Sequence, residues 1–212
     1  MTPNQFTREL GAARLLAIVR GNDTQAAVRT AVALVEEGFR YLEVSLNTAD
    51  AVDVISAVHD EVGTGATIGA GTVLSVDDVA RVAAAGAQFI VTPALAPSVA
   101  EAVRLDLPVL AGAFTPSEVY SAMDRGAAAI KLFPASLGGP RYLSALRDPF
   151  PDISFVPVGG VDESAAVDYL SRGALAVGIG SPLIGDAASG GDLPALRVRA
   201  RQFLAAAAGL QQ

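Results

Sequence analysis

The sequence contains no cysteine and only one histidine, and each scarcity excludes kinds of functional site. Without cysteine the chain can form neither a disulfide framework nor a thiolate metal site. The single histidine, His59, excludes the usual zinc sites built from several imidazoles and most histidine-dependent catalytic triads. Because His59 stands in a polar helical stretch, we expect it to be a solvated surface residue.

Long apolar runs and an excess of positive charge are also missing. No apolar run approaches the roughly 20 residues that a bilayer span needs, and no basic-then-apolar signal segment stands at the N-terminus. The formal net charge of −7 gives no electrostatic basis for nucleic-acid binding. We therefore expect a cytoplasmic protein without a nucleic-acid or membrane partner.

Apolar material for a core is plentiful. Hydrophobic residues make up 51% of the 212 residues and charged residues 17%, which excludes a disordered chain. The length fits one domain of the larger sort, and no linker or low-complexity segment interrupts the sequence. We predict a single domain over residues 1–212.

Short β-rich runs alternate with amphipathic helical stretches along the whole chain. The runs are Arg14–Arg20, Arg40–Ser45, Ala66–Thr72, Gln88–Thr92, Leu107–Ala111, Ala128–Phe133, Ile153–Val158 and Leu175–Gly180. Between them lie stretches such as Thr24–Glu37 and Ser75–Ala85. A glycine that can take the left-handed conformation ends the helix before several of the strands: Gly38, Gly86, Gly126 and Gly173.

This repeat predicts an α/β fold of the (β/α)8 barrel type, with an extra N-terminal helix at about Pro3–Leu10. A doubly wound open sheet is the alternative, because a strand count taken from sequence is uncertain by a strand or two. In a (β/α)8 barrel the active site lies at the C-terminal ends of the strands. Polar residues at those ends are therefore the candidates for function.

Lysine, like histidine, occurs once in the chain. Of 15 basic residues 14 are arginine, and the only lysine, Lys131, stands in the apolar run A-A-A-I-K-L-F-P. A lysine amine can lose its proton and attack a carbonyl carbon, whereas a guanidinium cannot. A genome that favours arginine explains the general bias, but it does not explain a lone lysine inside an apolar strand. We interpret Lys131 as a nucleophile that forms a Schiff base.

Alternation of side chains along the strands places a carboxylate beside this amine. In Tyr41–Leu46 the apolar Leu42 and Val44 suit the helix-facing side, so Glu43 points into the barrel, and the same pattern puts Lys131 inside. The alternative is a buried structural ion pair between the two, which is a poor stabiliser. A carboxylate in reach of the amine can move the protons that carbonyl addition and carbon–carbon cleavage require.

The remaining strand ends offer groups for a substrate. Arg20 ends the first strand and suits a carboxylate or phosphate, although a plain surface arginine is the alternative. Gly69 and Gly71 leave room for close ligand approach, with the hydroxyl of Thr72 beside them. Glycine-rich loops follow the last two strands, at the place where many barrels bind phosphate; two tight turns are the alternative interpretation. Ser181 before Pro182 is typical of an N-cap.

These segments together resemble the 2-keto-3-deoxy-6-phosphogluconate / 6-phosphogalactonate aldolases, a family of class I barrels that form pyruvate enamines. The matching segments, in family order from residue 16 to 181, are L-A-I-V-R-G, Y-L-E-V-S-L-N-T, I-G-A-G-T-V-L, I-V-T-P, I-K-L-F-P-A-S, V-P-V-G-G-V and G-I-G-S. The lysine segment and G-A-G-T-V are the most specific. The resemblance implies a trimer that needs no metal or other cofactor.

Roles follow from the resemblance by position. Lys131 looks like the Schiff-base lysine and Glu43 the general acid/base, while Thr72 corresponds to the residue that binds the pyruvyl carboxylate. Pro93 and Phe133 correspond to the residues that shape the pocket. The phosphate-binding set is similar to Gly159, Gly160, Gly180 and Ser181.

One departure concerns the substrate. Gluconate-type enzymes carry an arginine where this chain has Asn47, whereas galactonate-type enzymes are similar to it there and have R-G after the first strand. The resemblance implies cleavage of one of these phospho sugar acids to pyruvate and glyceraldehyde 3-phosphate, with related activity on 4-hydroxy-2-oxoglutarate. The alternatives are a phosphosugar isomerase or synthase, and a catalytically silent barrel that binds phosphorylated metabolites.

Overall fold

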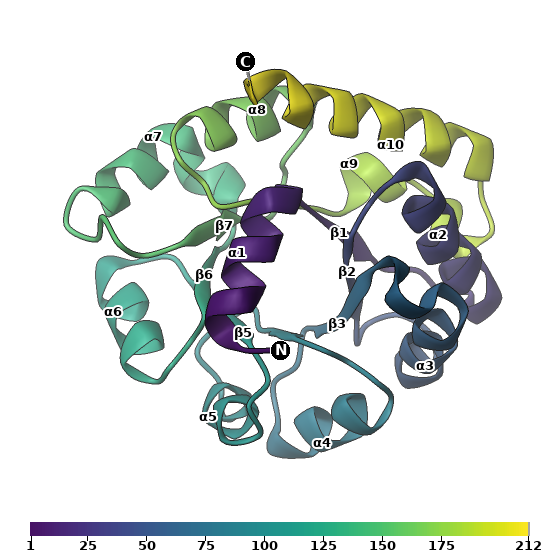
Figure 1. The fold of residues 1–212 in the computed structure, drawn as a ribbon, viewed down its shortest axis with the longest axis horizontal. Helices are drawn as coiled ribbons and strands as arrows, with labels where there is room; N and C mark the ends of the chain where they lie inside the picture. Colours follow the sequence, from purple (N-terminus) through teal and green to yellow (C-terminus); the bar gives the residue numbers. More distant parts are fainter. Residues whose placement is uncertain (212) are drawn as a thin grey trace.

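The computed structural model describes residues 1–211, which form a ring of eight parallel strands surrounded by helices (Figure 1). Neighbouring strands pair in the order β7-β6-β5-β4-β3-β2-β1-β8. The two end strands meet through a bridge between Val158 and Gly178 and a 2.8 Å hydrogen bond from the Leu175 N–H to the Phe155 carbonyl. The predicted (β/α)8 barrel is confirmed, and the open doubly wound sheet is wrong. The domain prediction also covered Gln212, which lies outside the described residues.

The strands are β1 (Leu15–Val19), β2 (Tyr41–Ser45), β3 (Thr67–Gly71), β4 (Ile90–Val91), β5 (Val109–Ala113), β6 (Ala129–Leu132), β7 (Phe155–Pro157) and β8 (Val177–Ile179). The α-helices are α1 (Pro3–Ala13), α2 (Thr24–Glu37), α3 (Ala51–Val62), α4 (Val76–Ala84), α5 (Pro97–Arg104), α6 (Pro116–Asp124), α7 (Ala135–Arg147), α8 (Glu163–Ser171), α9 (Ser181–Ile184) and α10 (Leu193–Ala208). Short 3-10 helices are η1 (Gly63–Gly65), η2 (Ala187–Ser189) and η3 (Gly209–Gln211). Over residues 1–211 no helix is both long and apolar enough to cross a bilayer.

Side chains at the helix N-termini determine where the helices start. The Asp23 carboxylate accepts a 2.7 Å hydrogen bond from the Ala26 N–H and starts α2, and Ser75 and Asp78 form a reciprocal capping box at the start of α4. Helix α2 ends at Gly38, whose φ of +119° glycine adopts without a steric clash because it has no Cβ. Gly86, Gly126 and Gly173 have similar positive φ values, which confirms the predicted helix ends.

Side chains of the strands alternate between two hydrophobic clusters. Leu42 and Val44 belong to the larger cluster, between the strands and the helices, while Tyr41 belongs to the smaller one inside the barrel. Ile130 and Leu132 likewise belong to the outer cluster. The strand alternation predicted from sequence is therefore confirmed for β2 and β6.

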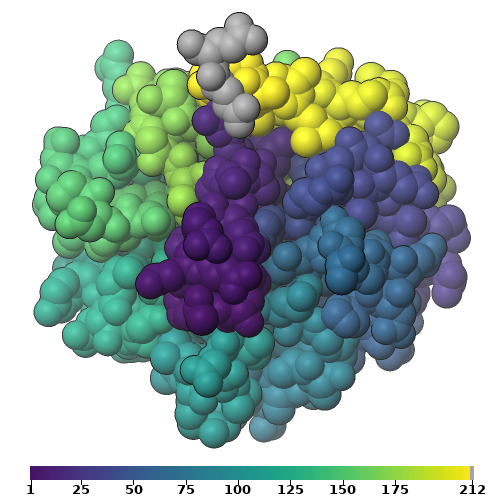
Figure 2. All heavy atoms as spheres, in the orientation of Figure 1, coloured from purple at the N-terminus to yellow at the C-terminus, as the bar shows by residue number. Residues whose placement is uncertain are grey.

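Helix α1 closes the N-terminal end of the barrel and crosses its centre in Figures 1 and 2. Phe6 and Leu10 are fully buried there, and the Phe6 ring centroid lies 5.8 Å from that of Tyr41 and 5.1 Å from that of Phe89. Gly69 makes room for this packing, because a Cβ on it would lie 2.4 Å from Phe89 Cζ. A substrate can therefore reach the barrel interior only from the opposite end.

His59 is more buried than the sequence predicted. Its side chain is half-buried against Gly86, and its Nδ1 atom is buried without a hydrogen-bond partner in the described chain. The prediction of a solvated surface histidine is wrong, because the turn that carries Gly86 covers this face of α3. Sequence polarity does not show such a tertiary contact.

Candidate active site

A cavity of about 420 Å³ opens at the C-terminal ends of the strands. It brings together Lys131 and every residue predicted to bind substrate: Arg20, Thr72, Pro93, Phe133, Gly159, Gly160, Gly180 and Ser181. Sequence reasoning missed the rest of the wall, which is mainly apolar: Ile18, Val158, Pro182, Ile184 and Gly185. An alternating position in an apolar strand could have indicated Ile18, and Val158 and Pro182 directly adjoin predicted residues, but nothing in the sequence marked Ile184 or Gly185.

Lys131 projects from β6 into this cavity and is only 5% exposed. The ring centroid of Phe133 lies 5.2 Å from its Nζ atom. Among residues 1–211 no carboxylate lies within ion-pair distance of the amine. The amine is therefore free to approach a carbonyl carbon.

Glu43 lies inside the barrel beside β3 and is 1% exposed. A Cβ on Gly71 would lie 1.7 Å from its Oε1 atom, so the missing side chain of Gly71 provides the space for the carboxylate. The expectation that Gly69 and Gly71 make room for a ligand is wrong, since Phe89 and Glu43 fill the two spaces. Residues so far apart in sequence gave no sign of these contacts.

The carboxylate of Glu43 is not satisfied by the protein. Its Oε2 atom is buried and has no hydrogen-bond partner within the described residues. Because a buried unpaired carboxylate oxygen is costly, it is typical of a functional site. The alternative of a structural ion pair is contradicted, since no such pair joins Glu43 and Lys131 in residues 1–211.

Thr72 is held in an unusual backbone conformation at the end of β3. Its φ is +60°, a region that β-branched residues rarely adopt, and its Oγ1 lies 3.0 Å from the hydroxyl of Ser45. Thr72 lines the cavity, and this contact holds its hydroxyl in place. A threonine hydroxyl on a cavity wall can donate a hydrogen bond to a carboxylate oxygen.

Arg20 and the glycine pair Gly159 and Gly160 form another part of the cavity wall. Arg20 is exposed, lines the cavity and forms no ion pair within the described chain. Gly159 and Gly160 have φ values of +101° and +73°, which suit glycine. A guanidinium without an ion-pair partner can bind an anionic group in such a place.

Ser181 takes a different position in its helix from the predicted one. Helix α9 starts at Ser181 itself, Gly180 occupies the cap position, and no side-chain hydrogen bond caps the helix. The prediction of Ser181 as the N-cap is wrong by one residue, because the chain turns at Gly180. Without a capping bond, the Ser181 hydroxyl remains available to the cavity.

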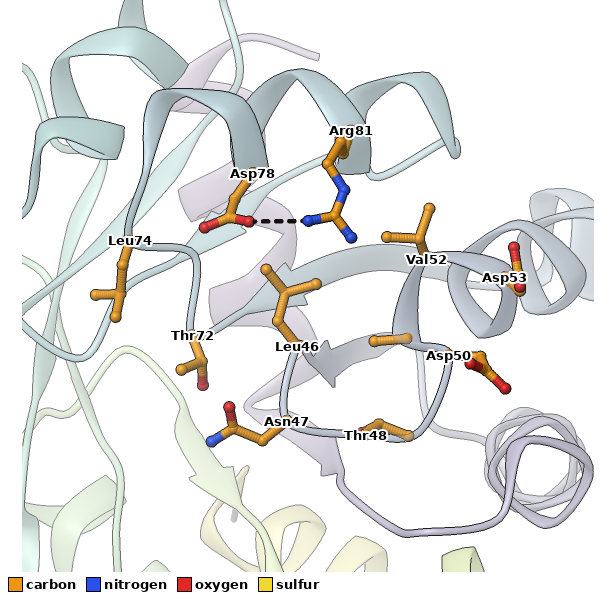
Figure 3. Close-up of a pocket in the computed structure, with 11 residues that line it drawn as sticks. Leu46, Asn47, Thr48, Asp50, Val52, Asp53, Thr72, Leu74, Asp78 and Arg81 are labelled. Atoms are coloured by element: carbon orange, nitrogen blue, oxygen red, sulfur yellow. Dashed lines mark hydrogen bonds and ion pairs between the residues drawn. The ribbon is translucent and has the colours of Figure 1, made fainter.

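A second hollow of about 570 Å³ adjoins the cavity at Thr72 (Figure 3). Its walls come from the segments that follow β2 and β3 and include Asn47, Asp50 and the ion pair of Asp78 with Arg81. Asn47 thus lies beside Thr72, whereas Arg20 lies on the wall of the cavity itself. Among residues 1–211 no group of three or more His, Cys, Asp or Glu side chains could hold a metal ion.

Comparison with known proteins assigns the family. The model of the family described as KDPG and KHG aldolase matches residues 7–195. The chain belongs to the KDPG and KHG aldolase family. Here KDPG denotes 2-keto-3-deoxy-6-phosphogluconate and KHG denotes 4-hydroxy-2-oxoglutarate.

Several members of this family are similar over most of their length. The chain is 41% identical to the KHG/KDPG aldolase of Escherichia coli over 180 residues, which covers 83% of this chain and 84% of that protein. It is 38% identical to the probable 2-dehydro-3-deoxy-6-phosphogalactonate aldolase of Rhizobium meliloti, over 91% of this chain and 90% of the relative.

A solved structure of the family adds chemical information. The KDPG aldolase of Legionella pneumophila, with pyruvate captured as a covalent carbinolamine intermediate, superposes with a TM-score of 0.84. It is 25% identical and matches 97% of this chain and 98% of that chain. A carbinolamine forms when an amine adds to a carbonyl group, so covalent amine chemistry occurs in this family.

Proposed function

We propose that this protein is a class I aldolase that cleaves a 2-keto-3-deoxy-6-phospho sugar acid to pyruvate and glyceraldehyde 3-phosphate through Lys131. The observation that carries the proposal is the position of the chain's only lysine, inside the cavity and free of any ion pair in the described residues. The other aliphatic amine is the N-terminus, which precedes α1 at the closed end of the barrel.

In the first half of the reaction the Lys131 amine adds to the C2 carbonyl of the substrate. The carbinolamine that forms loses its hydroxyl as water and becomes an iminium ion. This cation withdraws electrons from the adjacent C3 atom. The Glu43 carboxylate, inside the same barrel, supplies and removes the protons that the addition and the dehydration require.

Glu43 then acts as the general base for bond cleavage. It accepts the proton of the C4 hydroxyl, the C3–C4 bond breaks, and its electron pair moves to the iminium to give an enamine. Glyceraldehyde 3-phosphate leaves as the C4 aldehyde. Glu43 returns the proton to C3, and water hydrolyses the resulting iminium to pyruvate and the free Lys131 amine. The unpaired Oε2 atom and the small exposure of Glu43 support this role.

The walls of the cavity orient the substrate. The Thr72 hydroxyl binds the pyruvyl carboxylate, and Pro93 and Phe133 enclose the reacting carbons. At the other end Arg20 and the backbone of the glycine-rich loops bind the phosphate, together with Ser181. The apolar remainder of the wall limits water near the enamine.

Arg20 and Asn47 favour the galactonate epimer. The arginine that gluconate-type enzymes carry at the position of Asn47 is absent, while Arg20 supplies a cation on the cavity wall. Because the pyruvyl half is shared, we also expect slower cleavage of 4-hydroxy-2-oxoglutarate to pyruvate and glyoxylate. The ratio of kcat/KM for the two epimeric phospho acids tests the assignment, and a ratio near one would contradict it.

The reaction class is tested by release of pyruvate from either phospho acid. Wild-type enzyme should release it, and Lys131→Ala should release none although its circular dichroism and melting temperature match the wild type. Activity that survives in Lys131→Ala would overturn the proposal and indicate an isomerase or synthase. Phosphate-dependent thermal stabilisation of the wild type without turnover would indicate a silent binding barrel.

We also propose a homotrimer in the cytoplasm that works without a metal. Large apolar side chains that are strongly exposed, such as Tyr120 at 65% and Leu137 at 76%, support association between copies. Light scattering should give three times the mass of one chain. Treatment with a chelator should leave kcat unchanged.

A further inference from the structure

We propose that Arg199 is a positioning residue for phosphate binding, which it controls through the segment between β8 and α10. This segment, residues 180–192, contains two of the proposed phosphate-binding residues, Gly180 and Ser181, and supports a third, Arg20. The inference rests on the proposed function. Arg199 itself lies on α10 and does not line the cavity.

Arg199 holds the C-terminal end of the short helix α9. Its Nε atom donates a 2.7 Å hydrogen bond to the Leu183 carbonyl and its Nη2 atom a 3.1 Å bond to the Ile184 carbonyl. Gly185 makes the approach possible, since a Cβ there would lie 2.7 Å from Nη2. One guanidinium thus bonds two carbonyl groups at the end of a helix, where a cation is favoured.

The same segment packs against the loop that carries Arg20. Gly21 packs against η2 so closely that a Cβ on it would lie 1.9 Å from the Ala188 carbonyl oxygen. The N–H of Asn22 also donates a 3.2 Å hydrogen bond to the Ser189 hydroxyl. A shift of the segment therefore moves the loop that carries Arg20 as well as Gly180 and Ser181.

The far end of the segment is held by hydrogen bonds within the segment itself. The Asp186 carboxylate accepts a 3.1 Å hydrogen bond from the Asp192 N–H, and the Asp186 carbonyl accepts a 3.0 Å bond from the Gly191 N–H. The end that carries Gly180 and Ser181, by contrast, is held through the hydrogen bonds of Arg199 to α9. Loss of that guanidinium therefore frees the end of the segment that carries the proposed phosphate contacts.

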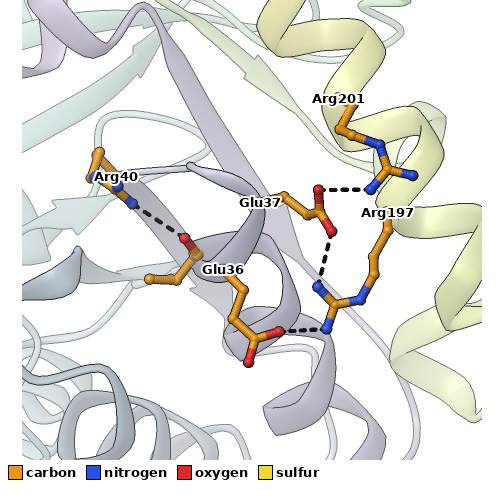
Figure 4. Close-up of polar contacts among 6 residues, drawn as sticks. Glu36, Glu37, Arg40, Arg197 and Arg201 are labelled. Atoms are coloured by element: carbon orange, nitrogen blue, oxygen red, sulfur yellow. Dashed lines mark hydrogen bonds and ion pairs between the residues drawn. The ribbon is translucent and has the colours of Figure 1, made fainter.

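Two other arginines of α10 provide matched controls, because they face α2 instead (Figure 4). Arg201 donates a 2.9 Å hydrogen bond to Glu37, and Arg197 pairs with both Glu36 and Glu37. Arg201→Met removes the same charge from the same helix as Arg199→Met. It leaves the contacts to α9 intact.

The experiment compares the full-length wild type, Arg199→Met, Arg199→Lys and Arg201→Met. Calorimetry with inorganic phosphate measures the anion site without turnover, and steady-state kinetics use the phospho acid and the unphosphorylated 4-hydroxy-2-oxoglutarate. We expect Arg199→Met to weaken phosphate binding and raise KM for the phospho acid about tenfold, as loss of charge-assisted hydrogen bonds does. The KM for 4-hydroxy-2-oxoglutarate and kcat on both substrates should stay within about twofold of wild type.

Arg199→Lys retains the charge and one donor, so it should restore part of the phosphate affinity, and Arg201→Met should match the wild type. Equal phosphate affinity in all four proteins would overturn the inference whether or not the phospho acid is cleaved.

Equal losses of phosphate affinity in Arg199→Met and Arg201→Met would attribute the effect to net charge and also overturn it. An equal rise in KM for the phospho acid and for 4-hydroxy-2-oxoglutarate in Arg199→Met would show that Arg199 has a general structural role, and it would also overturn the inference. If the wild type binds phosphate and Arg199→Met weakens that binding while no phospho acid is cleaved, the inference stands and the proposed function fails.

Discussion

Two glycines of β3 face the barrel interior. Gly69 lies nearer the N-terminal ends of the strands, which α1 covers, and Gly71 lies nearer the C-terminal ends, where the cavity opens. A side chain at Gly69 would meet the Phe89 ring, and one at Gly71 would meet the Glu43 carboxylate. The space beside Gly69 is filled by the ring of Phe89, which packs with Phe6 of α1. The space beside Gly71 is filled by the Glu43 carboxylate, which has an unpaired oxygen. One strand thus supports a packed core and a reactive site through the same residue type.

The comparison shows how stability and chemistry are separated along the barrel axis. The N-terminal end buries apolar rings and the phenol of Tyr41. Burial raises the pKa of that phenol, so Tyr41 stays neutral at physiological pH. The C-terminal end keeps an amine and a carboxylate apart instead of joining them in an ion pair. Substitutions at the two ends should therefore have different effects.

Glu43→Gln should have the largest effect among variants that keep Lys131. The amide has the same size but cannot accept or return a proton, so kcat should fall by at least about 10². Pyruvate release under substrate saturation measures this, with the urea midpoint as the control for folding. A loss below about threefold would contradict the assignment of Glu43 as the proton carrier.

Gly71→Ala should come next, because it displaces the carboxylate without removing it. The new Cβ would occupy the place of Glu43 Oε1, and we expect kcat to fall about tenfold. The double variant with Glu43→Gln should be no slower than Glu43→Gln alone, since both changes act on one group. Additive losses would show that Gly71 acts by another route.

Gly69→Ala should affect stability instead. Its Cβ would overlap the Phe89 ring in a packed core, so we expect a loss of about 1–3 kcal/mol in the free energy of unfolding. Below the unfolding transition, kcat should match the wild type. If Gly69→Ala lowers kcat as much as Gly71→Ala, the proposed separation of the two ends is wrong.

The smallest effect concerns the surface carboxylate Glu37. Hydrogen bonds from the Arg197 guanidinium, and then Arg201, hold the pKa of Glu37 below its usual value of 4.5. Its contribution to stability is therefore present above pH 4.5 and is lost as the pH falls through the lowered pKa. Glu37→Gln should have a lower urea midpoint than wild type at about pH 7, and the difference should shrink at about pH 3. A difference independent of pH would contradict this role.

The fold and the central pair could be predicted from sequence because both depend on local periodicity. Alternation along β2 and β6 was sufficient to place Glu43 and Lys131 on the inner face. Contacts between distant segments could not be predicted in this way, since nothing near Gly71 identifies Glu43 as its neighbour. The same limit applies to Arg199, which bonds α9 from another helix, and to the half-buried His59.

The central claim is that Lys131 forms a Schiff base, and borohydride trapping with pyruvate tests it most directly. Reduction should fix a pyruvyl group on the enzyme, and peptide mass spectrometry should find the added mass on the peptide that contains Lys131. Lys131→Ala should acquire no adduct under the same conditions. An unmodified Lys131 peptide, or an adduct only on the N-terminal amine, would contradict the account.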